Sequence, residues 1–235
     1  MRLSTWNCRI GAFRRKAARV ARFKPDVLIV PEMEELEGEL FLDGDHQPTF
    51  RQRCSGPGWS RGLGVLSYTG IELEPAFHAS EAIAGFWPFT ARRGDLRFQV
   101  AAVWTFKEEA KPREAYLQAH AGIDHYRGWI KQLPTVLLGD FNVDASRDHR
   151  QWADLIARTE SLDLVSAYHH FFAEVPGSER RATHFHGGKP NSKFHLDYCF
   201  LPRDWADRSL HVRVGAHEDW SDVSDHVPLI VDVDV

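Results

Sequence analysis

Several predicted strands end in side chains that can do chemistry. The clearest case is Leu137-Leu138-Gly139-Asp140-Phe141-Asn142, in which an apolar run stops at a glycine and is followed by Asp140 and Asn142. Because side chains alternate along an extended backbone, Asp140 and Asn142 can point to one side while Phe141 points to the other. An ionised Asp accepts a proton or faces a cation, and an Asn amide both donates and accepts hydrogen bonds. Taken alone, the stretch is also typical of an ordinary turn after a strand.

Two more strands near the N-terminus end in the same way. Residues 3–7 read as a first strand that ends at Asn7, and residues 27–30 read as a buried strand that is followed by Pro31 and Glu32. The apolar positions of residues 13–21 recur at helical spacing between them. Strand, helix and strand predict a right-handed crossover, which would leave Asn7 and Glu32 at the carboxyl ends of neighbouring strands.

The C-terminal part of the chain supplies two further polar motifs. They are His195-Leu196-Asp197-Tyr198 and Ser224-Asp225-His226, which comes just before the last predicted strand. The apolar neighbours of Asp197 predict that it lies in a strand and is partly buried, where an ionised carboxylate needs a partner. His226 is the obvious candidate, because a carboxylate fixes the tautomer of an imidazole and favours its charged form.

The elements that must position these groups follow from periodicity and from Gly and Pro punctuation. Further strands are predicted at residues 65–68, 71–73, 86–89, 96–104, 136–139, 164–168, 183–185, 194–201, 210–214 and 227–233. Two more helices are predicted, one over residues 112–133 and one that contains Trp152, Leu155, Ile156 and Thr159. Residues 51–58 and 173–181 read as loops, residues 34–39 as a solvated acidic segment, and residues 169–172 as a strand end with core aromatics.

Length and composition indicate an ordinary globular protein. The 235 residues contain no linker, repeat or low-complexity tract, so we expect a single domain over residues 1–235. The formal net charge of −4 counts against strong nonspecific binding to nucleic acid, although it leaves room for a local basic groove. Three widely spaced cysteines, no apolar signal core and no run long enough to span a membrane predict a reduced, cytoplasmic protein without membrane insertion. We also expect a monomer.

The five motifs, in their order and spacing, resemble those of the endonuclease/exonuclease/phosphatase superfamily. These divalent-metal phosphoesterases include abasic-site endonucleases, pancreatic-type deoxyribonuclease, neutral sphingomyelinases and inositol-polyphosphate phosphatases. The resemblance extends from Thr5-Trp6-Asn7 to Ser224-Asp225-His226. It implies an α/β fold, a four-layer α/β/β/α sandwich in which two mixed β-sheets pack face to face with helices outside. It also implies a site at one end of the two sheets.

The resemblance assigns metal-side roles to three residues. Glu32 would be the main metal ligand, Asn7 would support it and could approach the metal, and Asp225 would be a second metal-side carboxylate. The implied cofactor is Mg²⁺ or Mn²⁺, because hard cations take oxygen ligands and keep several waters.

The remaining roles concern the attacking water and the phosphate. Asp140 would orient or deprotonate the water, and Asn142 would hold a phosphate oxygen. His226 would contact the scissile phosphate, oriented by Asp197. The metal and His226 would together offset charge on the phosphoryl oxygens.

The chain departs from the family pattern at one strand. In many relatives the strand that corresponds to residues 100–105 ends in a His or Tyr that touches the phosphate, whereas here it ends in Trp104-Thr105. Trp104 or Thr105 could supply one donor, but neither carries charge. Because of this difference, the substrate class of the known family members cannot be assigned directly to this chain. The residues expected to bind the metal are not affected.

Three functions follow as alternatives. The first is a metal-dependent phosphodiesterase that hydrolyses DNA or RNA by in-line attack of a metal-side water. The second keeps this chemistry on a phospholipid, sugar phosphate or nucleotide. The third, which we do not favour because the ligand residues are present, is a non-catalytic binding module on the same fold.

Other polar and aromatic residues allow less specific interpretations. His184 and His186 alternate along a predicted strand and could form a zinc site with His195, but no fourth ligand is evident and we favour surface histidines. Aromatic side chains that could stack on bases, but that we expect mainly in the core, are Trp59, Phe86, Trp87 and Phe89. Arginines that could clamp phosphate, with a solvated surface role equally expected, are Arg51, Arg53, Arg61, Arg92 and Arg93.

Overall fold

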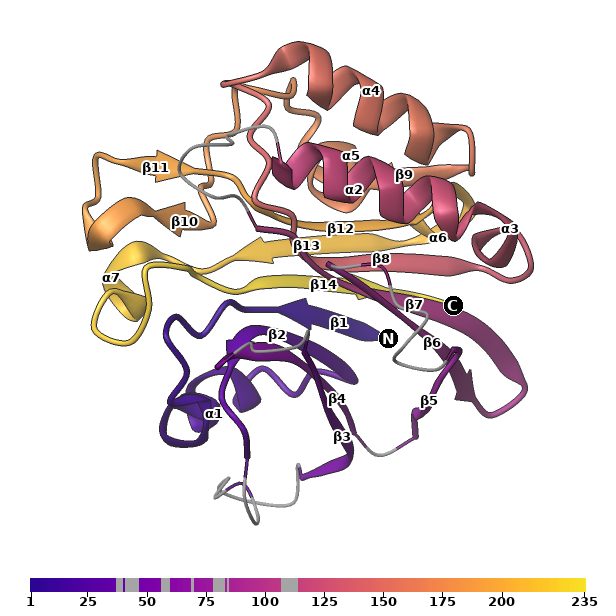
Figure 1. Cartoon of the computed structure of the whole chain (residues 1–235), viewed down its shortest axis with the longest axis horizontal. Helices are drawn as coiled ribbons and strands as arrows, with labels where there is room; N and C mark the ends of the chain where they lie inside the picture. Colours follow the sequence, from indigo (N-terminus) through magenta and orange to yellow (C-terminus); the bar gives the residue numbers. More distant parts are fainter. Residues whose placement is uncertain are drawn as a thin grey trace.

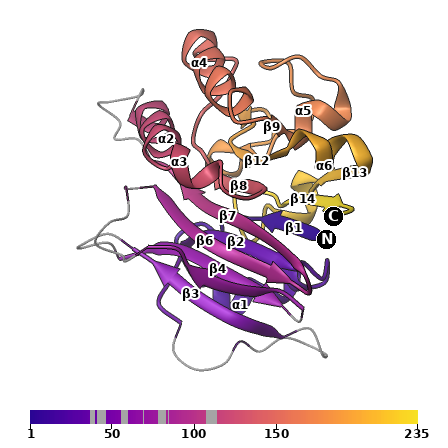
Figure 2. The same cartoon turned by 90° about the vertical axis from the view of Figure 1, so that its right-hand side faces the viewer.

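The structure is a computed structural model, and it describes residues 1–36, 40, 47–55, 60–68, 70–77, 83, 85–106 and 114–235. Within these residues, two six-stranded mixed β-sheets pack face to face and helices cover their outer faces (Figures 1 and 2). This arrangement confirms the predicted four-layer sandwich. Among the described residues, no helix has the length and apolar character needed to cross a membrane.

The first sheet has the strand order β13-β14-β1-β2-β4-β3. Its strands are β1 (Arg2–Thr5), β2 (Val27–Met33), β3 (Pro48–Cys54), β4 (Gly62–Tyr68), β13 (Leu210–Val214) and β14 (Leu229–Val233). Strands β1 and β2 are parallel and are joined through α1 (Phe13–Ala21), as the strand-helix-strand pattern predicted. The other neighbours in this sheet are antiparallel.

The second sheet has the strand order β5-β6-β7-β8-β12-β9. Its strands are β5 (Glu72–Pro75), β6 (Phe86–Arg93), β7 (Leu96–Trp104), β8 (Thr135–Asp140), β9 (Leu164–Ser166) and β12 (Asp197–Pro202). Its helices are α2 (Glu114–His125), α3 (Arg127–Ile130), α4 (His149–Glu160), α5 (Ala167–Phe172) and α6 (Arg203–Arg208). In this sheet only β7 and β8 pair in parallel. Because β12 runs antiparallel to β8, the polar end of β8 lies beside the start of β12.

A small two-stranded sheet extends from one end of the sandwich. It consists of β10 (His184–Phe185) and β11 (Lys193–Phe194), and helix α7 (His217–Trp220) lies near it at the same end (Figure 1). This end of the molecule carries the site described below.

The core is continuous across the layers because the central strands are apolar on both faces. Val136 and Leu138 of β8 pack between the sheets, whereas Leu137 and Phe141 pack beneath the outer helices. A strand that is buried on both faces reads as an unbroken apolar run, which is how residues 136–138 appear in the sequence.

The strand predicted over residues 194–201 is divided into β11 and β12, which belong to different sheets. Two further predictions are wrong. Residues 51–54, predicted as part of a loop, belong to β3, an edge strand in which Phe50 faces the ring of Phe89 at 6.1 Å while Arg51 is exposed. Charged residues are common on edge strands, and here they obscured the alternation of apolar and polar residues that would have predicted a strand. Residues 167–172, predicted as strand, form the short helix α5, because a brief aromatic run does not by itself distinguish a strand from a helix.

Several predictions fall partly or wholly outside the described residues. The helix predicted over residues 112–133 is present as α2 and α3, which meet at Tyr126. Residues 112 and 113 of that prediction, residues 37–39 of the acidic segment, and Trp59 lie outside the described part of the chain.

Candidate active site

An open cleft of about 740 Å³ lies at the end of the sandwich where β1, β2 and β8 finish. Six of the seven site residues that were predicted from the sequence line this cleft: Asn7, Glu32, Asp140, Asn142, Asp225 and His226. The seventh, Asp197, lies beneath it with no exposed surface. The structure therefore brings the seven residues together from both sheets.

Asn7 joins the two sheets at the floor of the cleft. Its Nδ2 atom donates to Glu32 Oε1 at 3.2 Å and to Asp140 Oδ2 at 3.0 Å. Its Oδ1 atom accepts from the backbone amide of Arg9 at 2.9 Å, which fixes the orientation of the amide group. Asn7 is 1% exposed and lies between the two carboxylates, to which it is hydrogen-bonded.

Glu32 is held in an unusual backbone conformation. Its φ is 62°, and the pairing of β2 with β4 shifts register between Val30 and Met33, so the strand bulges at this residue. Bulges redirect side chains, and a left-handed non-glycine residue persists only where its surroundings enforce it. The bulge here turns the Glu32 carboxylate into the cleft.

The Glu32 carboxylate is ionised and strongly hydrogen-bonded. Its Oε2 atom accepts from the Ile10 amide at 2.8 Å and from Arg61 Nη1 at 2.6 Å. Burial alone would raise its pKa, but the hydrogen bonds from Ile10, Asn7 and Arg61 outweigh burial and lower that pKa.

Asp140 is buried beside a second carboxylate. It is 1% exposed, and its Oδ1 atom accepts from the Asn142 amide at 2.9 Å. Burial and the negative charge of Asp197 raise the Asp140 pKa to about 7, although His226 and Asn7 act in the opposite direction. Asp140 is therefore protonated more readily than an ordinary aspartic acid.

His226 forms a buried ion pair with Asp197. The two are joined between Nδ1 and Oδ2 at 2.8 Å, and Asp197 Oδ1 accepts no hydrogen bond from the described residues. Burial would lower the His226 pKa, but the charge and hydrogen bond of Asp197 outweigh it and raise that pKa to about 9. The imidazolium presents Nε2 to the cleft, 3.9 Å from Asp140 Oδ2.

Ser224 ties His226 to Asn7, which follows the neighbouring strand β1. Its hydroxyl donates to the Asn7 carbonyl at 2.8 Å and accepts from the His226 amide at 3.0 Å. The indole of Trp6 also donates to the His226 carbonyl at 3.0 Å. The segment that follows β1 and the segment that precedes β14 are thereby fixed at the same wall of the cleft.

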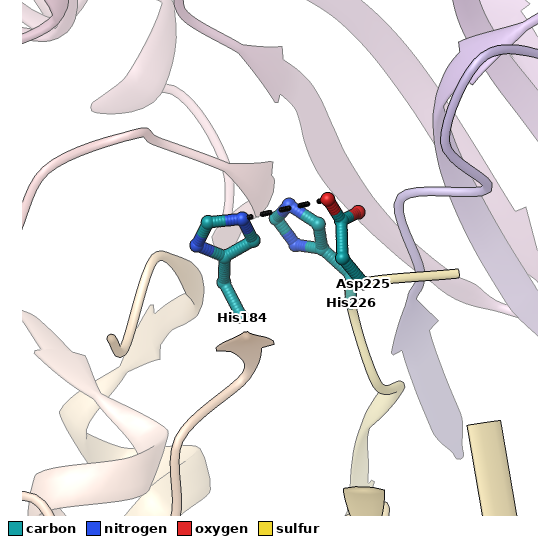
Figure 3. A group of neighbouring side chains, drawn as sticks. All are labelled: His184, Asp225 and His226. Carbon is teal, nitrogen blue, oxygen red and sulfur yellow. Dashed lines mark ion pairs between the residues drawn. The ribbon is translucent and has the colours of Figure 1, made fainter. Parts of the chain in front are cut away.

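Asp225 and Asn142 stand at the edges of this arrangement. Asp225 Oδ2 lies 3.4 Å from Arg9 Nε and 3.8 Å from His184 Nε2 (Figure 3). Asn142 adopts a φ of 50°, and its Nδ2 atom donates to the Thr105 carbonyl at 2.6 Å, which leaves one amide hydrogen for a ligand.

The strand end that departs from the family pattern supplies no replacement donor. The Thr105 hydroxyl is buried and donates to the Phe141 carbonyl. Trp104 packs against Phe106 and the core between the sheets, and it does not line the cleft. Neither side chain occupies the position of a phosphate donor.

The three histidines of the suggested zinc site do not converge. His195 Nδ1 contacts the Arg181 carbonyl at 2.8 Å, and its ring packs on Tyr168 at 4.2 Å, away from the cleft. His184 instead lies beside His226, with 4.5 Å between ring centroids. Sequence analysis missed this position because it depends on pairing between distant segments.

Arginines at the cleft were also hard to find from sequence. Arg61 was one of five candidate arginines with no feature to single it out, and it binds Glu32. Arg9 and Arg147 line the cleft, and the Arg147 guanidinium lies 3.9 Å above the Phe194 ring. Of the other candidate arginines, Arg53 pairs with Glu35 and Arg92 pairs with Glu72.

Solved structures share this fold over the whole chain. A truncated TDP2 from Caenorhabditis elegans aligns with a TM-score of 0.72 and 12% identity, over 100% of this chain and 97% of that one. The endonuclease domain of TRAS1, a telomere-specific non-LTR retrotransposon, gives a TM-score of 0.68 and 13% identity over 100% and 98%. The 3′ phosphatase NExo from Neisseria, bound to a product DNA hairpin, gives 0.68 and 18% over 100% of both.

At these identities the likeness concerns the fold. Comparison with curated proteins returned no match. The sequence itself matches the Endonuclease/Exonuclease/phosphatase family over residues 4–226, which spans every motif from Asn7 to His226. The chain therefore belongs to the Endonuclease/Exonuclease/phosphatase family, whose members are hydrolytic phosphoesterases.

Proposed function

We propose that this protein is a Mg²⁺- or Mn²⁺-dependent phosphodiesterase that cleaves DNA or RNA. The observation that carries the proposal is the hydrogen-bonded series Glu32–Asn7–Asp140, which faces the His226–Asp197 ion pair within one cleft. This arrangement offers anionic oxygens on one side and a cationic imidazole on the other, as hydrolysis of a phosphoester at a metal ion requires.

The donor set on the Glu32 side fits a hard divalent cation. Glu32 is ionised, Asp225 adds a second carboxylate to the same cleft, and the Asn7 Nδ2 donor holds Glu32 in place. Mg²⁺ is commonly held by one or two carboxylates, with water and substrate completing its shell. When bound, such an ion activates water and offsets phosphoryl charge.

Asp140 is suited to accept the proton of the attacking water. A general base works best when its pKa lies near the operating pH, and the Asp140 pKa is raised to about 7. The Asn7 and Asn142 hydrogen bonds fix both of its oxygens, so the carboxylate does not need to reorganise during the reaction.

His226 and Asn142 are suited to bind the phosphate. His226 carries a positive charge because of Asp197, and its Nε2 atom faces the cleft. The unused amide hydrogen of Asn142 can donate to a second phosphoryl oxygen. Fixed donors of this kind stabilise charge that develops in the transition state.

The cleft rim favours a nucleic-acid substrate. Arg147 combines a cation with the aromatic face of Phe194, which suits a phosphate next to a base or sugar. Two proteins of similar fold are described as an endonuclease domain and as a phosphatase bound to DNA. These observations support the nuclease alternative for this chain.

A smaller phosphoester remains the second candidate, and a specific observation favours it. Asp144 and Asp148 line the cleft beside Arg147, and the formal net charge is −4, so the rim repels part of a long polyanion. A phospholipid, sugar phosphate or nucleotide would reach the same site without that contact.

A substrate panel tests the proposal. Purified protein would be assayed with Mg²⁺ and with Mn²⁺ on plasmid DNA, single-stranded oligonucleotide, RNA and bis-p-nitrophenyl phosphate. Asp140→Asn and His226→Gln should each lower the rate by at least about 100-fold, the range of a lost acid–base group. Exposed His211→Gln serves as the control. Cleavage of no phosphoester, or full activity in either site variant, would contradict the proposal.

A further inference from the structure

A second group of potential metal ligands lies at the wall of the cleft that faces the hydrogen-bonded series Glu32–Asn7–Asp140. We propose that His184, Asp225 and His226 bind Zn²⁺, and that zinc held there blocks the phosphate side of the cleft. The zinc-binding part stands on geometry alone, whereas the inhibitory part rests on the function proposed above.

Backbone pairing fixes the two histidines side by side. His184 and His226 form an isolated antiparallel bridge, in which the Phe185 amide donates to the Asp225 carbonyl at 2.7 Å and the Val227 amide donates to the Thr183 carbonyl at 2.8 Å. The rings then lie next to each other (Figure 3), with 4.5 Å between their centroids. Two segments that are distant in sequence thus present two imidazoles to one point.

The ligand atoms are already close to a coordination geometry. One atom from each of His184, Asp225 and His226 lies within 4.8 Å of the others, and His184 Nε2 is 3.8 Å from Asp225 Oδ2. Zinc bonds of about 2.0–2.2 Å need ligand atoms slightly closer than this, which small side-chain rotations provide. The side chains are only 14%, 16% and 6% exposed, so little mobility is lost on binding.

Asp197 prepares His226 for a metal. Its hydrogen bond to Nδ1 leaves Nε2 as the atom that faces the cleft. A carboxylate behind a metal-binding imidazole fixes the tautomer and strengthens the ligand. Asp140 Oδ2, 3.9 Å from the same Nε2, adds negative charge next to the ion.

The ligand types distinguish this group from the Glu32 side. Two imidazole nitrogens and one carboxylate suit Zn²⁺, whereas Mg²⁺ prefers oxygen ligands. The Arg9 guanidinium competes for Asp225 Oδ2 at 3.4 Å, but its side chain is 41% exposed and can turn into solvent. With three protein ligands, a fourth position stays open to the cleft.

Occupation of this group would remove the group proposed to contact phosphate. Zinc on His226 Nε2 would prevent that atom from donating to a phosphoryl oxygen. Zinc would also take Asp225, which the proposed Mg²⁺ site shares, while its imidazole ligands do not suit Mg²⁺. Zinc should therefore inhibit cleavage even when Mg²⁺ is saturating.

The test measures zinc binding directly. Equilibrium dialysis with Zn²⁺ in excess Mg²⁺ should show a site of one ion per chain, and Co²⁺ in its place should give the visible absorption of a nitrogen-ligated ion. His184→Gln should weaken zinc binding by more than about tenfold, since even outer-shell partners of a metal ligand contribute that much. His211→Gln, which changes an exposed histidine outside the cleft, should bind zinc as the wild type does.

Inhibition is scored against each variant's own zinc-free rate. The zinc concentration that halves this rate should rise more than about tenfold in His184→Gln, in step with the loss of affinity. His184→Asn repeats the measurement if the Gln variant unfolds, as judged by its thermal midpoint. Equal zinc affinity in the wild type and a folded His184 variant would overturn the inference. Zinc binding that depends on His184, in a protein that cleaves no phosphoester, would instead overturn only the proposed function.

Discussion

Asp140 and Asp197 lie directly opposite each other on the antiparallel strands β8 and β12. Both are almost fully buried, with 1% and 0% exposure, so two carboxylates share a site that water barely reaches. His226 stands between them, 2.8 Å from Asp197 and 3.9 Å from Asp140. Like charges this close raise one pKa and attract a proton to the shared imidazole. The strand register thus places a carboxyl group with a raised pKa next to an imidazole with a raised pKa.

The first prediction concerns the charge of His226. In the metal-free protein its imidazole should titrate with a pKa of about 9, because Asp197 outweighs burial. In Asp197→Asn the pKa of the same ring should fall, because burial is then opposed only by the charges of Asp140 and Asp225. NMR titration of the histidine ring resonances measures both. A wild-type pKa near the ordinary value would show that Asp197 does not control this ring.

The second prediction concerns Arg61, whose guanidinium occupies the carboxylate assigned to the metal. Nη1 lies 2.6 Å from Glu32 Oε2, so a cation must share or displace this contact. Arg61→Ala should lower the Mg²⁺ concentration for half-maximal activity roughly two- to fivefold, which corresponds to the ~0.5–1 kcal/mol of a half-exposed ion pair. Arg92→Ala, which breaks the remote Glu72 pair, is the matched control. A higher Mg²⁺ requirement in Arg61→Ala would show that Arg61 supports the ion.

The third prediction concerns the residue before Asp140. Gly139 has a φ of +152°, and a Cβ atom there would lie 1.8 Å from the Val103 carbonyl oxygen. Gly139→Ala should destabilise the fold by about 3 kcal/mol and displace Asp140, so activity should also fall. Gly128→Ala adds the same methyl group where nothing lies within 4 Å and should stabilise helix α3 by up to ~1 kcal/mol. Urea unfolding compares the two, and equal stabilities would contradict the predicted clash.

The fourth prediction concerns acid stability away from the cleft. Burial would raise the Glu179 pKa, but hydrogen bonds from His169 and the Gly177 amide lower it to about 2. A lowered carboxyl pKa stabilises the fold above the unfolded-state value of 4.5 and loses this effect as pH falls towards 2. Glu179→Gln should therefore cost on the order of 2 kcal/mol at neutral pH and much less near pH 3.

The matched control for that prediction is Glu72→Gln. Glu72 pairs with Arg92 as Glu179 pairs with His169, but the Glu72 side chain is 68% exposed. Exposed pairs of this kind contribute little, so its unfolding free energy should change by less than about 1 kcal/mol at either pH. A Glu179 variant that loses the same stability at both pH values would show that packing, and not charge, is responsible.

Much of the fold was accessible from sequence because burial leaves a clear pattern. The apolar runs of β2, β7 and β8 predicted central strands, and polar residues at their ends predicted where a site would form. Edge elements were harder, because β3 mixes exposed Arg51 with inward-facing Phe50 in a polar segment. Whether such a segment forms a strand depends on its packing against distant residues, which local composition does not reveal.

The details of the site depended on backbone geometry that no local pattern encodes. The positive φ of Glu32 follows from a register shift between β2 and β4, and the neighbours of His184 follow from its bridge to His226. The contact of Arg61 with Glu32 depends on the path of the chain just before β4. The sequence does not reveal this path, so the five candidate arginines looked equivalent. Residue types located the site, but pairing between distant segments decided which side chains meet.

The central claim is that groups from both sheets hold one hard cation beside Glu32, opposite a phosphate-binding imidazole. Anomalous diffraction from crystals soaked in Mn²⁺ tests it most directly. The account predicts a manganese peak within coordination distance of a Glu32 oxygen, about 2.0–2.2 Å, and loss of that peak in Glu32→Gln. A peak elsewhere in an active enzyme, with none at Glu32, would contradict it.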